Sequence, residues 1–214
     1  MSNSRLIGAF GLMVALANLT GCAGKIRYPS YYVLNLPTPM PVTDRPARIF
    51  GSVAVREFDS PRFLREGPIA YRESPEQLGF YDYHRWAVDP RRAVTEAVIQ
   101  AMRSRGVFRS VDRFDGRGTP DCLLTGSIDH LEEVDHGSQV SVEVGLSAQL
   151  IDLRTGEVLW QGASSKTSAL DRRSVPGIVA EMSRETEGAV EGLVSSLQDR
   201  VSAASSLLRS KAEP

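Results

Sequence analysis

The strongest constraint on the fold is a strict alternation of polar and apolar residues between Gln139 and Leu150. Side chains at every second position of a β-strand point to the same face of the sheet. One face of this strand is therefore apolar and the other polar, which is typical of an antiparallel sheet with one covered and one solvated face. The apolar positions are Val140, Val142, Val144, Leu146, Ala148 and Leu150.

Two more long strands are predicted beside this one. Before it, Leu124, Gly126 and Ile128 share one face of a strand. After it, a turn over residues 152–157 leads into a strand that begins at Val158, and Gly156 suits the positive φ of a tight hairpin turn. Shorter strands are expected over residues 31–36, 49–56, 69–71, 80–83 and 107–114.

Two helices are predicted by apolar stripes at intervals of three and four residues. Pro90 opens the first, since its missing N–H costs nothing at that position, and Gly106 ends it. The second covers residues 176–208 and would be roughly 45 Å long. We therefore expect an α+β two-layer sandwich, a mainly antiparallel sheet covered on one face by two helices, the C-terminal one long.

The N-terminus has the order of features that a secretory signal has. Arg5 precedes an uncharged apolar run over residues 6–17, which is too short to span a bilayer comfortably. The run ends in Leu19-Thr20-Gly21-Cys22, which resembles the bacterial lipoprotein lipobox. That resemblance implies cleavage before Cys22, with diacylglycerol on its thiol and an acyl chain on its amine. Ala23 follows, without the Asp of an inner-membrane retention signal, so the expected location is the periplasmic face of the outer membrane in a Gram-negative cell.

These features divide the chain into four parts. We expect a signal peptide over residues 1–21, the lipidated Cys22 and a tether over residues 22–30, one folded domain over residues 31–209, and a frayed tail over residues 210–214. If Cys22 is acylated, Cys122 has no intramolecular partner for a disulfide. Because Cys122 lies at the start of an apolar run, we expect its thiol to be buried.

Apart from the lipid on Cys22, no cofactor is expected.

Charge and motif content argue against nucleic-acid binding and catalysis. The formal net charge is −1, so there is no basic excess for a nucleic-acid backbone. The three histidines lie far apart, without the spacing of a zinc motif. An acidic run could be imagined as a metal cluster, but we interpret it as a solvated turn between strands; its residues are Glu132, Glu133, Asp135 and His136. The sequence therefore predicts no metal site and no enzyme.

The irregular segment before the first helix is rich in arginine and aromatic residues. Tyr71, Arg72, Arg85 and Trp86 are the candidate partner interface, because such residues are enriched where proteins meet. The alternative is that they pack this segment onto the sheet, with arginines over aromatic faces.

The same segment carries a family resemblance, together with Tyr31-Tyr32-Val33-Leu34 after the lipobox. Its motifs are Arg62-Phe63-Leu64, Ile69-Ala70-Tyr71-Arg72, Leu78-Gly79-Phe80-Tyr81 and Arg85-Trp86-Ala87; Ile178–Ser183 adds to them. Over nearly all of the mature chain, the sequence resembles the ABC-type transport auxiliary lipoprotein family, of the paraquat-inducible protein C-like kind.

The resemblance implies a non-catalytic subunit of a trans-envelope lipid transport system. Its partners would be an MCE-domain protein, docked at the outer membrane, and an ABC permease and ATPase in the wider system. The surplus length of the C-terminal helix suggests a contact with a partner or with a second copy in a homo-oligomer. The alternative is a lipoprotein accessory to another envelope machine, for barrel biogenesis or lipopolysaccharide export.

Overall fold

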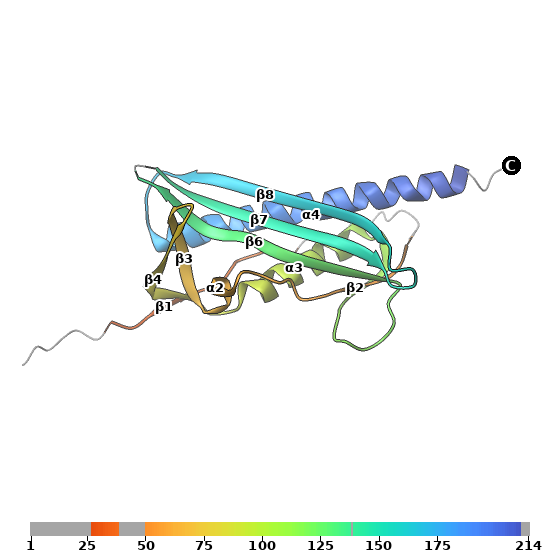
Figure 1. Cartoon of the computed structure of the whole chain (residues 1–214), viewed down its shortest axis with the longest axis horizontal. Helices are drawn as coiled ribbons and strands as arrows, with labels where there is room; N and C mark the ends of the chain where they lie inside the picture. Colours follow the sequence, from red (N-terminus) through yellow and green to blue (C-terminus); the bar gives the residue numbers. More distant parts are fainter. Residues whose placement is uncertain (1–26, 39–49, 138, 211–214) are drawn as a thin grey trace, which may run out of the picture.

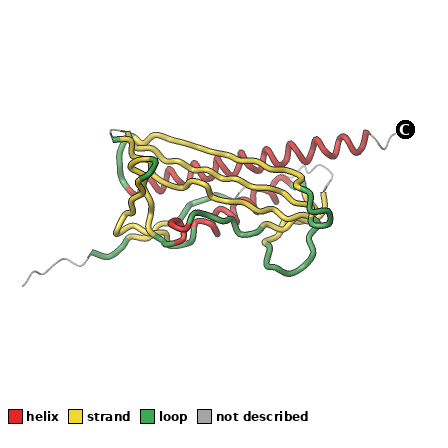
Figure 2. Tube along the Cα trace, in the orientation of Figure 1, coloured by secondary structure: helices red, strands yellow, loops and turns green. Residues whose placement is uncertain are grey.

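The computed structural model describes residues 27–38, 50–137 and 139–210. In this part of the chain, one mixed sheet of eight strands packs against two helices, with a third helix of one turn (Figures 1 and 2). The strands are β1 Ser30–Tyr32, β2 Phe50–Val55, β3 Pro68–Ser74, β4 Gln77–Trp86, β5 Phe108–Arg113, β6 Cys122–His136, β7 Gln139–Asp152 and β8 Val158–Leu170. The helices are α2 Arg62–Arg65, α3 Pro90–Arg105 and α4 Val175–Ser210.

Strands β6, β7 and β8 form a long antiparallel meander, as the alternation predicts. Leu124 and Ile128 of β6 lie opposite Leu150 and Leu146 of β7, so the apolar faces of the two strands coincide. A register shift between Ile128 and His130 then keeps the buried Leu131 on that apolar face. Without this extra residue, the second half of β6 would present its other face to the core.

The second edge of β6 is shared by two groups of strands. β2 pairs with the start of β6 and continues to β5, whereas β3 pairs with the end of β6 and continues through β4 to β1. The pairs of β2 and β3 with β6 are parallel, as are β1 with β4 and β2 with β5. The sheet is therefore mixed, although its longest pairs are antiparallel. The expected first strand is also shorter than residues 31–36, since β1 ends at Tyr32.

The two long helices cover one face of the sheet, as expected. α3 begins after Asp89, whose carboxylate accepts a hydrogen bond from the Arg91 backbone N–H, and it ends at Gly106 with a φ of 67°. α4 packs on β7, β8 and α3. The α+β architecture with a long C-terminal helix is thus confirmed.

The ends of the described chain lie far apart. In Figure 1, β1 and β4 lie at the left end of the molecule, while α4 runs to the right and extends past the sheet. A helix of 36 residues is about 54 Å long, so α4 exceeds the length that the sheet requires. None of the described helices combines the length and apolar character that crossing a membrane requires.

Candidate functional site

The four residues proposed as a partner interface lie on the β3–β4 hairpin. Tyr71 and Arg72 belong to β3, and Arg85 and Trp86 to β4. Trp86 is buried in the core, while Arg85 is partly buried at the Pro68–Arg85 pair of the hairpin. The fold therefore brings all four residues to one hairpin, but Trp86 is buried there and Arg85 is partly buried.

Arg72 joins the hairpin to the end of β6 through a two-bond ion pair. Its Nε and Nη2 atoms donate to the two carboxylate oxygens of Glu132 at 2.7 and 3.0 Å, and its Nη1 donates to the Pro75 carbonyl at 3.0 Å. Only 1% of the Glu132 side chain is exposed, against 26% for Arg72. The hydrogen bonds to Glu132 raise the pKa of Arg72, so the guanidinium stays charged.

A second buried carboxylate, Glu133, has partners from two segments that are distant in sequence. The Tyr81 hydroxyl of β4 donates to Glu133 Oε2 at 2.6 Å. Arg173, between β8 and α4, places its Nε 2.9 Å from Glu133 Oε1 and its Nη1 2.7 Å from Asp135 Oδ2. The Arg173 guanidinium also lies 5.7 Å from the centroid of the Tyr71 ring. The cluster thereby ties the hairpin, β6 and the start of α4 together.

Burial dominates the titration of this cluster. It raises the pKa of Glu133 above the usual value, although the hydrogen bond from Tyr81 and the charge of Arg173 oppose the shift. Burial, followed by the hydrogen bond to Glu133, raises the pKa of Tyr81 to about 12. Tyr81 is therefore a neutral hydrogen-bond donor at physiological pH.

The interpretation of residues 132–136 as a solvated turn is wrong. Strand β6 continues to His136, and Glu132 and Glu133 are both fully buried within it. The β3–β4 hairpin pairs with this end of β6 at Tyr71–Glu133 and Arg72–Val134 and shields the carboxylates from water. Their partners lie 52 and 60 residues away in sequence, so no local pattern reveals them.

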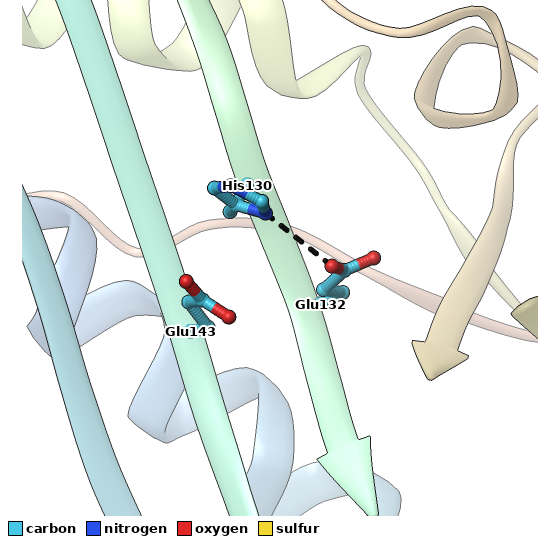
Figure 3. A group of neighbouring side chains, drawn as sticks. All are labelled: His130, Glu132 and Glu143. Atoms are coloured by element: carbon cyan, nitrogen blue, oxygen red, sulfur yellow. Dashed lines mark hydrogen bonds and ion pairs between the residues drawn. The ribbon is translucent and has the colours of Figure 1, made fainter. Parts of the chain in front are cut away.

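A further acidic residue at this site is Glu143 of β7, which is paired with Glu132 on the neighbouring strand β6. Figure 3 shows Glu143 on β7 facing His130 and Glu132 on β6, and the possible ligand atoms of the three residues lie within 4.8 Å of one another. His130 Nδ1 is 3.4 Å from Glu132 Oε1. However, Arg72 donates to both oxygens of Glu132, so a metal ion would have to share these oxygens with a guanidinium and bind beside its positive charge. The donor set therefore fits an ion-pair cluster better than a metal centre.

An open groove of about 460 Å³ lies between α3, α4 and the segment that follows β1. Its lining includes Leu36, Pro37, Ala97, Ala101 and Gly188, with charged residues of α4 at the rim. The groove exists because small side chains on both helices leave room between them.

Cys122 is buried, as predicted from its apolar surroundings. Burial raises the pKa of its thiol to about 11, and the carboxylates of Asp152 and Asp121 add to the shift. A thiol with so high a pKa is a poor nucleophile at neutral pH. Cys22, the predicted lipidation site, lies outside the described residues.

Two proteins of known structure have a fold similar to that of this chain. A DUF330-family protein from Xanthomonas campestris has a similar fold: the TM-score is 0.69 at 16% identity, over 82% of this chain and 99% of that one. An uncharacterised protein of known structure gives a TM-score of 0.62 at 13% identity, over 79% of this chain and 99% of that one. At these identities the likeness shows the fold alone. No curated protein sequence matches the chain.

The sequence profile described as "ABC-type transport auxiliary lipoprotein component" matches residues 32–193. The match includes the β3–β4 hairpin, both buried glutamates and about the first half of α4. Since it spans most of the sequence, the protein belongs to the ABC-type transport auxiliary lipoprotein family.

Proposed function

We propose that the protein is a non-catalytic subunit of an MCE-type lipid transport system, held at the periplasmic face of the outer membrane by the acylated Cys22. It docks the MCE-domain protein there, and an ABC permease and ATPase complete the system. The observation that carries this proposal is the family match over residues 32–193, which makes the chain an auxiliary component of an ABC-type transporter.

The shape of the molecule supports a role as an adaptor. The described N-terminal residues, which follow the predicted anchor, lie at the end of the molecule that holds β1 and β4 (Figure 1). The C-terminal part of α4 extends past the opposite end of the sheet. An anchor at the first end leaves the projecting helix free to meet a partner in the periplasm.

The buried ion pairs support a structural role for the hairpin. Arg72 and Arg173 each hold a fully buried glutamate, and Tyr81 donates to one of them. These paired side chains make this end of the molecule rigid, and none of them is an activated nucleophile. Because the chain itself is proposed to be non-catalytic, the energy for transport comes from the ATPase partner.

Copurification tests the docking role. The lipidated protein, expressed with the MCE protein of its own system, is expected to carry that protein through two affinity steps. A variant truncated after Ala203 keeps the buried Val201 and should keep the unfolding temperature of the parent, but it should lose the complex because it lacks the last turns of α4. Deletion of residues 211–214 alone is the matched control and should keep the complex. Capture of a barrel-assembly or lipopolysaccharide-export component instead, or an equal loss of folding and binding on truncation, would contradict the proposal.

Fractionation tests the anchor. Cys22→Ala should release the protein into the soluble periplasmic fraction, while the parent separates with outer-membrane vesicles. Mass spectrometry of the parent should find three acyl chains on residue 22. An unmodified N-terminus, or cofractionation with the inner membrane, would refute the location.

A further inference from the structure

Exposed large apolar side chains of the described residues are concentrated at one end of the molecule. Most of them belong to β1, β4 and the residues that flank these strands, and we call this surface the aromatic patch. The patch consists of Tyr28, Tyr31, Val33, Phe80, Tyr83 and Val88. The remaining two are Leu153, in the β7–β8 turn, and Val158, the first residue of β8, at the opposite end of the molecule (Figure 1).

The pairing of β1 with β4 brings the patch together. Tyr31 is in register with Arg85, and the Ala87 backbone N–H donates to the Tyr32 carbonyl at 2.7 Å. The Arg27 guanidinium lies 4.9 Å from the centroid of the Tyr83 ring. Residues from before β1 therefore contact β4, although more than 50 residues separate them in sequence.

The exposure of these rings is not a by-product of core packing. Along β1 and the residues after it, Tyr32 and Leu34 pack against the core, whereas Tyr31 and Val33 alternate with them and point to solvent. Tyr28 is 77% exposed and Tyr31 63%. Such exposed rings add little to the core, and several of them gathered at one end of a molecule are typical of an interaction surface.

The distance from the predicted anchor limits where the patch can lie. Six peptide units separate Cys22 from Tyr28, and a fully extended chain covers at most about 3.5 Å per residue. Tyr28 is thus within roughly 20 Å of the acylated residue, which itself sits at the membrane surface. Leu153 and Val158, at the far end, have no such tie to the anchor.

We propose that the aromatic patch lies on the phospholipid surface of the membrane that holds the anchor. The proposal rests on the lipidation of Cys22 that the proposed function includes. Tyrosine suits the membrane–water interface because its ring is apolar and its hydroxyl stays hydrated. Arg27, stacked on Tyr83, can reach a phosphate group. The patch then fixes the tilt of the domain, so that α4 projects away from the membrane instead of lying along it.

The charge of the patch indicates which lipids it needs. Arg27 stacks on Tyr83 and Arg85 is in register with Tyr31, while Asp82 is an exposed acidic residue of the same strand. The patch therefore carries at most a small positive charge, so contact should form on zwitterionic vesicles and depend only weakly on salt.

Tryptophan fluorescence on brominated lipids tests the contact. The mature, lipidated Tyr31→Trp protein is reconstituted in phosphatidylethanolamine–phosphatidylcholine vesicles, with bromine on the acyl chains. The emission added by this tryptophan, relative to the parent with its buried Trp86 and Trp160, should fall by about half or more, as for a ring at the headgroup–acyl boundary. Leu153→Trp is the matched control at the opposite end and should lose almost nothing.

The outcomes separate this inference from the proposed function. If the protein floats with the vesicles but the two tryptophans are quenched equally or not at all, the patch does not touch lipid and the inference fails, while the anchor stands. If the protein carries no acyl chains and does not float, the proposed function fails first. Quenching that disappears when the protein self-associates on the vesicles would assign the patch to a second copy and overturn the lipid contact.

Discussion

Replacement of Arg72 by methionine should be among the most damaging changes at the β3–β4 hairpin. The substitution removes both hydrogen bonds to Glu132 and keeps a side chain of similar length. Glu132 is 1% exposed, and the polar groups left near its carboxylate are His130, at 3.4 Å, and the acidic Glu143 of β7. Loss of one partner from a buried ion pair costs about 3–5 kcal/mol, because the remaining charge stays out of water. For a domain of this size, the loss corresponds to a fall of roughly 10 °C in unfolding temperature.

Replacement of the other partner, Glu132, should lower the free energy of unfolding by less. In Glu132→Gln the orphaned partner is Arg72, whose side chain is 26% exposed and can turn toward water, so we expect a loss of about 1–2 kcal/mol. A double variant, Arg72→Met with Glu132→Leu, should recover most of the stability, since it leaves no buried charge. Urea unfolding followed by circular dichroism measures all three variants, and the coupling free energy follows from the cycle.

The asymmetry between the two single variants is the decisive result. If Arg72→Met costs no more than Glu132→Gln, or less than about 1 kcal/mol, Glu132 is not the buried charge described above. The difference in free energy of unfolding between Arg72→Met and the parent should also become smaller at acidic pH. The reason is that a buried carboxyl group without a partner takes up a proton. A deficit that does not change with pH would point to lost packing instead.

Three further expectations follow from the same structure. Burial raises the pKa of Glu133 on folding, so folding takes up a proton there, and this contribution to stability is lost as pH rises through the folded-state pKa. Glu133→Gln should remove that pH dependence in urea titrations between acidic and neutral pH, and an unchanged slope would contradict it. Cys122, with a pKa of about 11, should resist a thiol reagent at pH 8 until the protein unfolds; rapid labelling of the folded protein would show that the site is open. Gly106→Ala should cost about 1 kcal/mol by thermal unfolding, because φ there is 67°, and a neutral result would mean that α3 ends elsewhere.

Local sequence patterns predicted the elements well. The alternation over residues 139–150 became β7, Pro90 and Gly106 bound α3, and Gly156 has a φ of 75° in the β7–β8 turn. Each of these features depends on steric preferences or on periodicity within a few residues, and a sequence shows both directly.

The same patterns failed where two distant segments supply one environment. Glu132 and Glu133 looked solvated because consecutive charged residues are seldom buried. Their burial depends on Arg72, Tyr81 and Arg173, which reach them only when the hairpin pairs with the end of β6 and α4 packs on the sheet. The residues offered as a partner interface lie on one hairpin, where Arg72 pairs with Glu132 and Trp86 is buried in the core.

The sequence by itself determined which segments become strands and helices, which face of each is apolar, and the family to which the chain belongs. Tertiary structure alone decided that β6 shares one edge between two groups of strands, that two glutamates are buried as ion pairs, and that the exposed rings of β1 and β4 gather at one end. The physical reason is range: periodicity and capping act between near neighbours, whereas burial and charge pairing depend on residues that only the folded chain brings together.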